Sequence, residues 1–218
     1  MSRQKKTLML LIYAIASSLL WSSLALAQSP TKAESNQMRR VKHQVLTSTH
    51  LPSIRVRFDK TFKYVGSQKF ILYGRSQVEQ YFFVDANNQQ LIKRMYMVQF
   101  EGYLPNVNAT YDYPATETVN LAGQTYLVNA ERIPNVSATL KQDPQSDVAR
   151  AGSFLEGKGY RISESIMFQR FVRLVDEAKR NEFILLYVED TGPGAAAENE
   201  RARQEFSSRA LKGFTILK

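Results

Sequence analysis

The sequence predicts a single domain of the α+β class, built mainly from an antiparallel sheet of about six or seven strands with two packed helices. At 44% hydrophobic and 22% charged residues, the 218-residue chain has the composition of an ordinary globular domain. Aromatic and β-branched runs follow one another with short polar turns between them, which favours antiparallel neighbours. Two segments with helical spacing come after the fifth and the seventh strand, so strands and helices are segregated along the chain.

The first five strands lie in the first half of the chain. The first covers residues 54–58, where apolar side chains alternate with Arg55 and Arg57, as in a strand with one buried face. A loop with two prolines, residues 102–118, separates the fourth strand from the fifth. The other aromatic and β-branched runs that are typical of strands cover residues 69–73, 79–86, 91–101 and 125–128.

The second half begins with a helix. Asp143 is expected to cap its free amides, Pro144 to stand at its first position, and Gly157 or Gly159 to end it. Residues 183–188 are apolar with no polar alternate face, so we expect their strand to be central and covered on both sides. The remaining elements are strands at residues 165–175 and 182–189, a helix at about 195–212 and a short closing strand at 214–217.

The N-terminus has the pattern of a secretory signal peptide. Arg3, Lys5 and Lys6 precede an uncharged run over residues 7–27, which ends in Ala25-Leu26-Ala27. We expect residues 1–27 to be cleaved after Ala27, with export to the periplasm or secretion. An uncleaved anchor stays open, because about 20 apolar residues can span a bilayer. No later apolar run approaches that length, so no transmembrane segment is expected after cleavage.

Residues 28–50 are polar and basic and are expected to form a linker or tail, which leaves residues 51–218 as the α+β domain. The tail carries Arg39, Arg40 and Lys42, and an alternative is that it docks on an anionic lipid or polymer. The domain has 22 Lys+Arg against 19 Asp+Glu, so most of the net charge of +9 lies before residue 51. A nearly neutral domain does not favour nucleic acid as a partner.

Composition excludes several kinds of active site. The chain has no cysteine, which excludes disulfide scaffolds, thiol catalysis, iron–sulfur ligation and cysteine-zinc sites. Its two histidines, His43 and His50, lie in the predicted tail, so a Ser-His-Asp triad is not expected. Phosphate-binding glycine motifs are absent, and residues 85–88 lack the glycine and glutamate that would complete a calcium loop. We therefore expect neither a metal nor a cofactor.

Carboxylate and tyrosine chemistry remains for an enzyme. Glu101 and Asp112 lie at one strand end and in the loop after it, together with Tyr103, Tyr111 and Tyr113. Two carboxylates in different environments can act as acid and base. In the structural alternative, which the pattern favours, the tyrosines pack over the sheet edge with their hydroxyls in water.

Arg170 interrupts an apolar strand face, which otherwise runs from Ile166 to Leu174. A buried guanidinium requires a carboxylate, backbone acceptors or a bound anion. Arg170 could extend along the sheet to solvent, or hold the acidic head group of a ligand in an apolar pocket. The favoured arrangement is a structural pair with a sheet carboxylate, for which the candidates are Glu79, Glu101 and Glu189.

The leading hypothesis is an exported, non-enzymatic protein that binds an amphiphilic or acidic small molecule or an envelope partner. The alternative is a hydrolase or lyase of the envelope that uses Glu101 and Asp112. No oligomeric state is indicated by the sequence. The candidate ligand-binding residues are Arg170, Tyr103, Tyr111 and Tyr113.

Overall fold

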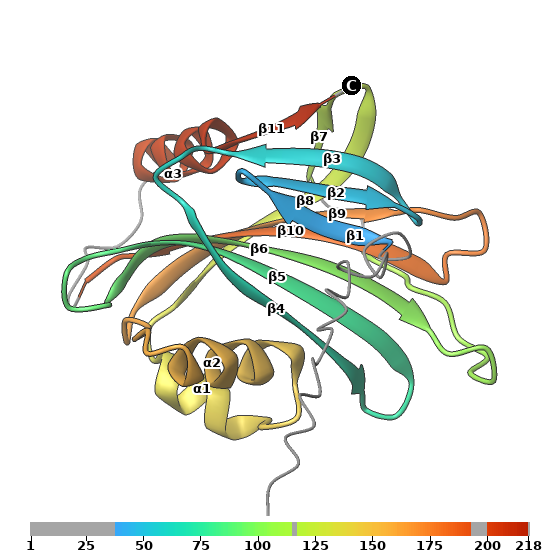
Figure 1. Cartoon of the computed structure of the whole chain (residues 1–218), viewed down its shortest axis with the longest axis horizontal. Helices are drawn as coiled ribbons and strands as arrows, with labels where there is room; N and C mark the ends of the chain where they lie inside the picture. Colours follow the sequence, from blue (N-terminus) through green and yellow to red (C-terminus); the bar gives the residue numbers. More distant parts are fainter. Residues whose placement is uncertain (1–37, 115–116, 193–199, 218) are drawn as a thin grey trace, which may run out of the picture. The chain divides into compact units, whose positions relative to one another are not determined.

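A computed structural model describes residues 38–114, 117–192 and 200–217. These residues form two antiparallel sheets and three helices, which confirms the α+β class and the mainly antiparallel strands (Figure 1). The predicted signal peptide, residues 1–27, lies outside the described residues. No helix in the described part of the chain is long and apolar enough to cross a membrane.

Seven strands form the large sheet, in the order β4-β5-β6-β10-β9-β8-β7. β10 is the fourth of the seven strands, and its residues 183–185 and 187–188 are buried. This confirms the central strand that its uninterrupted apolar run predicts. The strands are β4 (Lys63–Leu72), β5 (Ser76–Ala86), β6 (Ile92–Tyr103), β7 (Glu117–Leu121), β8 (Gln124–Ile133), β9 (Ile166–Leu174) and β10 (Asn181–Asp190).

Four strands form a separate small sheet, in the order β1-β2-β3-β11, with bounds Arg39–Lys42, Val45–Thr49, Ser53–Phe58 and Phe214–Leu217. β1 and β2 lie in the segment for which we expected a linker, residues 28–50, so that expectation is corrected for its second half. The inward-facing residues of these two strands include Arg39 and Ser48, both buried. With polar residues on the inner face, the sequence shows no apolar alternation that would predict a strand.

Three helices are described where two were expected. They are α1 (Val136–Gln142), α2 (Asp147–Gly157) and α3 (Glu200–Lys212). Asp143 does not begin a helix; it follows α1, and its side chain accepts from the amide of Gln145 in a turn. The cap of α2 is Ser146, whose hydroxyl accepts from the amide of Ala149.

The large sheet has a different partner on each face, as Figure 1 shows. One face, here the aromatic face, packs against the small sheet and α3, with side chains such as Tyr81, Phe83, Tyr96 and Phe183 in one core cluster. The other, the helix face, is covered by α1 and α2. Its core cluster is richer in aliphatic residues and methionine and includes Phe82, Val84, Met95, Met97, Ala151, Leu155, Ile166 and Val188.

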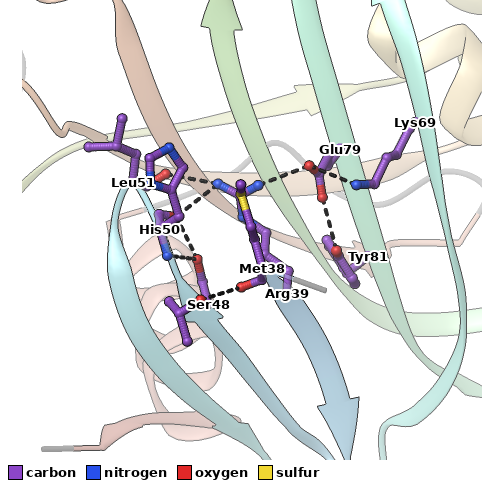
Figure 2. A network of polar contacts seen from close by, with 9 residues as sticks. Met38, Arg39, Ser48, His50, Leu51, Lys69, Glu79 and Tyr81 are labelled. Atoms are coloured by element: carbon purple, nitrogen blue, oxygen red, sulfur yellow. Dashed lines mark hydrogen bonds and ion pairs between the residues drawn. The ribbon is translucent and has the colours of Figure 1, made fainter. Parts of the chain in front are cut away.

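A buried ion pair joins the two sheets (Figure 2). Nη1 of Arg39, in β1, donates to Glu79 of β5 at 2.9 Å, and Nη2 donates to the carbonyl oxygens of His50 and Leu51 at 2.9 and 3.0 Å. The guanidinium also lies 4.0 Å from the centre of the Phe100 ring. Arg39 therefore belongs to the core of the fold. The network is completed by Lys69 and Tyr81, which both contact Glu79.

Candidate functional site

A cavity of about 260 Å³ lies between the helix face of the large sheet and the pair of helices α1 and α2. Its walls are mainly apolar. The sheet contributes Met95, Met97, Ile166, Phe168, Leu186 and Val188, and the helices contribute Val136, Leu140, Val148, Ala151, Gly152 and Leu155. Concave, mostly apolar sites with a few polar groups are what small-molecule ligands occupy in proteins.

The helical wall depends on a close approach between α1 and α2. A Cβ atom added at Gly152 would lie 3.0 Å from Cδ1 of Leu140, so a larger residue would require the Leu140 side chain to shift. Asn135 caps α1 by accepting from the amide of Ala138. The caps and this contact hold two short helices over the sheet without filling the space beneath them.

One part of the cavity wall is polar and carries Gln99, Asn129, Glu131, Asp147 and Arg170. Glu131 is exposed and Gln99 is fully buried. We call this part the polar end. A polar group in an apolar wall fixes the orientation of a ligand.

A chain of side-chain amides leads to the polar end. Nε2 of Gln68 donates to Gln80 at 2.7 Å, and Nε2 of Gln80 donates to Gln99 at 2.7 Å. Nε2 of Gln99 then donates to carboxylate oxygens of Glu101 and Asp147, at 2.8 and 3.0 Å. The three glutamines lie directly opposite one another on β4, β5 and β6, so the register of the sheet builds the chain. Both amide protons of Gln99 are used, and its orientation is fixed.

Arg170 lies at the polar end without an ionic partner. Its Nε donates to Oδ1 of Asn129 at 3.0 Å, and its guanidinium lies 5.4 Å from the centre of the Tyr113 ring. No ion pair joins Arg170 to a carboxylate of the described residues, and its two terminal nitrogens have no hydrogen-bond acceptor there. The expected pairing with Glu79, Glu101 or Glu189 is therefore not what this structure has.

Glu182 lies on the same face of the sheet as Arg170, in the neighbouring strand β10, and is almost fully buried. The hydroxyl of Tyr113 donates to its Oε2. Burial and the nearby Glu101 raise the pKa of Glu182 to about 7, against the lowering effects of the Tyr113 hydrogen bond and of Arg170. Near neutral pH this carboxyl is therefore partly protonated and only partly compensates the charge of Arg170.

Glu101 stands directly opposite Glu182 across β6 and β10. It accepts hydrogen bonds from the Tyr111 hydroxyl at 3.0 Å and from Gln99 at 2.8 Å. Burial and the negative charge of Asp147 raise the pKa of Glu101, although these hydrogen bonds act in the opposite direction. Both members of this carboxyl pair are thus easier to protonate than exposed glutamates.

The structure brings some of the sequence-predicted site residues together and leaves others apart. Tyr113 joins Arg170, and Tyr111 joins Glu101. Tyr103 stacks on Tyr111, with ring centres 4.5 Å apart, and borders a second cavity at the end of the sheet. Asp112 is exposed, and no contact with Glu101 is found among the described residues.

Sequence reasoning missed most of the polar residues of the site, among them Gln99, Asn129 and Glu182. Alternation along β6 was enough to place Gln99 on the same face as Glu101. Glu182 stands at the edge of an apolar run, which is a common place for a solvated charge. The pairing of Asn129 with Arg170 depends on the register of β8 and β9, and single-strand patterns do not carry that information.

The described residues contain no group of three or more histidine or carboxylate side chains placed to hold a metal ion. Comparison of the chain with known protein families, with curated proteins and with solved structures finds no match.

Proposed function

We propose that this protein is an exported, non-enzymatic binding protein whose cavity takes a small amphiphile with an acidic head group. One observation carries the proposal: the apolar cavity has at its polar end an arginine whose terminal nitrogens have no acceptor among the described residues. A guanidinium with free donors in a partly buried site favours a carboxylate or phosphate, which it can bind through two hydrogen bonds.

The size and walls of the cavity support a compact ligand. Its volume of about 260 Å³ is slightly below the range of roughly 300–1,000 Å³ that is usual for ligand pockets. Leucine, isoleucine, valine and methionine line it, so they suit an aliphatic or small cyclic group. We infer that the apolar part of the ligand lies under α1 and α2, with its head group at Arg170.

The carboxyl groups near Arg170 do not fully neutralise its charge, so an anion can still bind there. Asp147 is held by Gln99, and Glu131 is exposed, so its charge is screened by water. Glu182 is held by Tyr113 and is partly protonated near neutral pH. Binding an anion beside Arg170 further raises the pKa of Glu182, because a second negative charge disfavours its ionised form. The proposal therefore couples ligand binding to the uptake of a proton.

An enzyme that uses Glu101 and Asp112 has less support. Asp112 is exposed, whereas Glu101 is bonded to Tyr111 and Gln99, and a general acid and base must reach the same reacting group. No other observation favours a hydrolase or lyase.

The proposal is tested by native mass spectrometry of protein purified from the compartment where it accumulates, followed by titration with decanoate and with decanol. We expect a retained acidic molecule and saturable decanoate binding. Arg170→Gln should weaken decanoate binding by roughly ten- to a hundredfold, because charge-assisted hydrogen bonds contribute about 1.5–3 kcal/mol. Binding of decanol should change little.

Arg75→Gln is the control, since Arg75 is an exposed cation in the turn between β4 and β5. It should bind decanoate as the unchanged protein does. Absence of both a retained molecule and saturable binding contradicts the proposal, and so does equal binding by Arg170→Gln. The same spectrum tests export, because cleavage after Ala27 gives a defined mass.

A further inference from the structure

The outer face of the small sheet carries four cations. Along β1 and β3 the side chains alternate, and the exposed positions include Arg40, Lys42, Arg55 and Arg57. The other outward positions of the sheet are hydroxyl-bearing or apolar: Val45, Thr47, Thr49, Ser53, Thr215 and Leu217. The four strands contain no aspartate or glutamate.

The register of the sheet arranges these cations as a rectangle. Arg40 and Arg55 both pair with Thr47 of β2, and Lys42 and Arg57 both pair with Val45. Two strand spacings separate β1 from β3, which is about 10 Å, and two residues along a strand span about 7 Å. Four positive charges thus share one surface of roughly 7 by 10 Å between Cα positions.

None of the four cations forms an ion pair or a side-chain hydrogen bond with a described residue. Several cations elsewhere on the surface do: Lys93 pairs with Asp190 at 2.7 Å, and Arg209 pairs with Glu189 at 3.0 Å. Like charges this close repel one another, so folding alone gives no reason to gather them. A negatively charged partner would remove that repulsion.

Two exposed apolar side chains lie at one end of the same sheet. Met38 precedes β1 and is 56% exposed, and Leu51 follows β2 and is 39% exposed. The amide of Thr49 donates to the carbonyl oxygen of Met38 at 2.9 Å, so the start of β1 and the end of β2 are adjacent. Figure 2 shows Met38 and Leu51 beside the Arg39 network, whose other contacts fix this end of the sheet.

We propose that the outer face of the small sheet docks on an anionic lipid bilayer. The cations supply attraction to lipid phosphates, and Met38 and Leu51 supply side chains that can enter the headgroup region. No aromatic side chain faces outward from these strands, so the stacking that proteins use on single-stranded nucleic acid is missing. This inference does not depend on the cavity or on its ligand.

The structure changes which residues could make such a contact. Of the basic residues that the sequence groups in a tail, Arg39 is engaged with Glu79 inside the fold. Arg40 and Lys42 remain outside, and Arg55 and Arg57 join them from a strand that follows in the sequence. The basic surface is therefore a fixed feature of the sheet.

The test is co-sedimentation of the full chain with vesicles of phosphatidylcholine alone and with vesicles that also contain phosphatidylglycerol. We expect binding that requires phosphatidylglycerol. It should be lost at high salt, because the Debye length falls to about 3 Å at 1 M. The R40Q/K42Q/R55Q/R57Q variant should bind several hundredfold more weakly, since each cation near an anionic surface strengthens binding by roughly fivefold. Arg55→Gln alone should weaken it about fivefold.

The control replaces four exposed cations outside this sheet, R75Q/K141Q/K158Q/K179Q, with the same change in net charge. It should bind nearly as the unchanged protein does. Any segment common to all variants contributes equally to vesicle binding. The difference in binding between the variants therefore measures the contribution of the outer face of the small sheet. Circular dichroism melting checks that each variant is folded.

Three results would overturn the proposal: no preference for phosphatidylglycerol, equal binding by the sheet variant, or an equal loss in the control. A fourth is binding to heparin or single-stranded DNA without binding to vesicles, which would assign the face to a polymeric anion. Met38→Ser with Leu51→Ser separates these cases, because it should weaken vesicle binding and leave any heparin binding unchanged.

Discussion

The two faces of the large sheet are made by the same strands and packed in different ways. On the aromatic face, rings contact rings: Phe58 stacks on Phe83 at 4.0 Å, and Tyr96 lies 4.9 Å from Tyr187. On the helix face, aliphatic side chains, methionine and the stacked rings of Phe82 and Phe154 lie at the two short helices, and a cavity of about 260 Å³ remains. Alternation along each strand makes this division possible, because neighbouring residues face opposite ways.

The difference in packing indicates which face contributes more to stability. Large rings that interlock across two sheets fill their space and bury a large apolar area. The helix pair packs on the opposite face through residues such as Leu155 and Val136, both buried, and leaves the cavity beneath it. We infer that the aromatic face holds the sheets together and that the helix face is free to accommodate a ligand.

Truncation of a side chain on the aromatic face should lower the free energy of unfolding the most. Phe83→Ala should lower the free energy of unfolding by about 3–5 kcal/mol, because Phe83 is fully buried and contacts Phe58 and Tyr64. Met97→Ala, which truncates a wall of the cavity, should fall near the lower end of the usual range of about 2–5 kcal/mol, since part of its surface already faces a void. Urea denaturation measures both.

An equal loss in these two variants would contradict the comparison of the two faces. The control is the slope of the free energy of unfolding against urea concentration. A change in this slope indicates that the variant alters the unfolded or native state, and not only the packing.

A second expected effect is that stability of the helix face depends on pH through Glu182. Its pKa is raised from 4.5 to about 7 in the folded state. Below about pH 4.5 the carboxyl is protonated in both states, and between 4.5 and 7 only the folded state keeps the proton. Stability therefore falls as pH rises through this window, by up to about 3 kcal/mol.

Glu182→Gln removes this titration and should keep the hydrogen bond from Tyr113, because the amide oxygen can still accept it. The variant should equal the unchanged protein in stability near pH 4 and exceed it by up to about 3 kcal/mol at pH 8. Glu101, whose pKa is also raised by burial, remains in the variant, so some pH dependence of stability persists. Glu156→Gln, at an exposed carboxyl of α2, is the control. A constant difference in stability between Glu182→Gln and the unchanged protein from pH 4 to 8 would contradict this prediction.

Much of the large sheet could be predicted from the sequence, because its strands have one consistently apolar face. The central position of β10 follows from residues 183–188 alone. The small sheet was only half predictable: β3 and β11 have apolar inner residues, whereas β1 presents Arg39 inward. A buried arginine is interpretable only once Glu79, forty residues away, is known to lie beside it.

The candidate site, too, could be predicted from the sequence only in part. Arg170 could be singled out as a cation in an apolar face, and Tyr113 as one of three tyrosines in a loop. Their contact, and the carboxyl pair of Glu101 and Glu182, depend on strand register and on the path of the loop. The cavity depends on how closely α1 approaches α2, and α1 itself has no pattern strong enough to predict a helix of seven residues.

Enlarging a buried alanine distinguishes a cavity from a packed core most directly, although the expected changes in stability are small. Ala151 lines the cavity, and Ala210 is fully buried on α3 against the aromatic face. Ala210→Leu should lower the free energy of unfolding by about 1–3 kcal/mol, because the added atoms have no room. Ala151→Leu should change stability by less than about 1 kcal/mol, or raise it, because its added methyl groups enter existing space. It should also weaken decanoate binding, since side chain and ligand compete for that space. If Ala151→Leu destabilises as much as Ala210→Leu, the helix face is packed like the aromatic face, and Arg170 has no ligand cavity beside it.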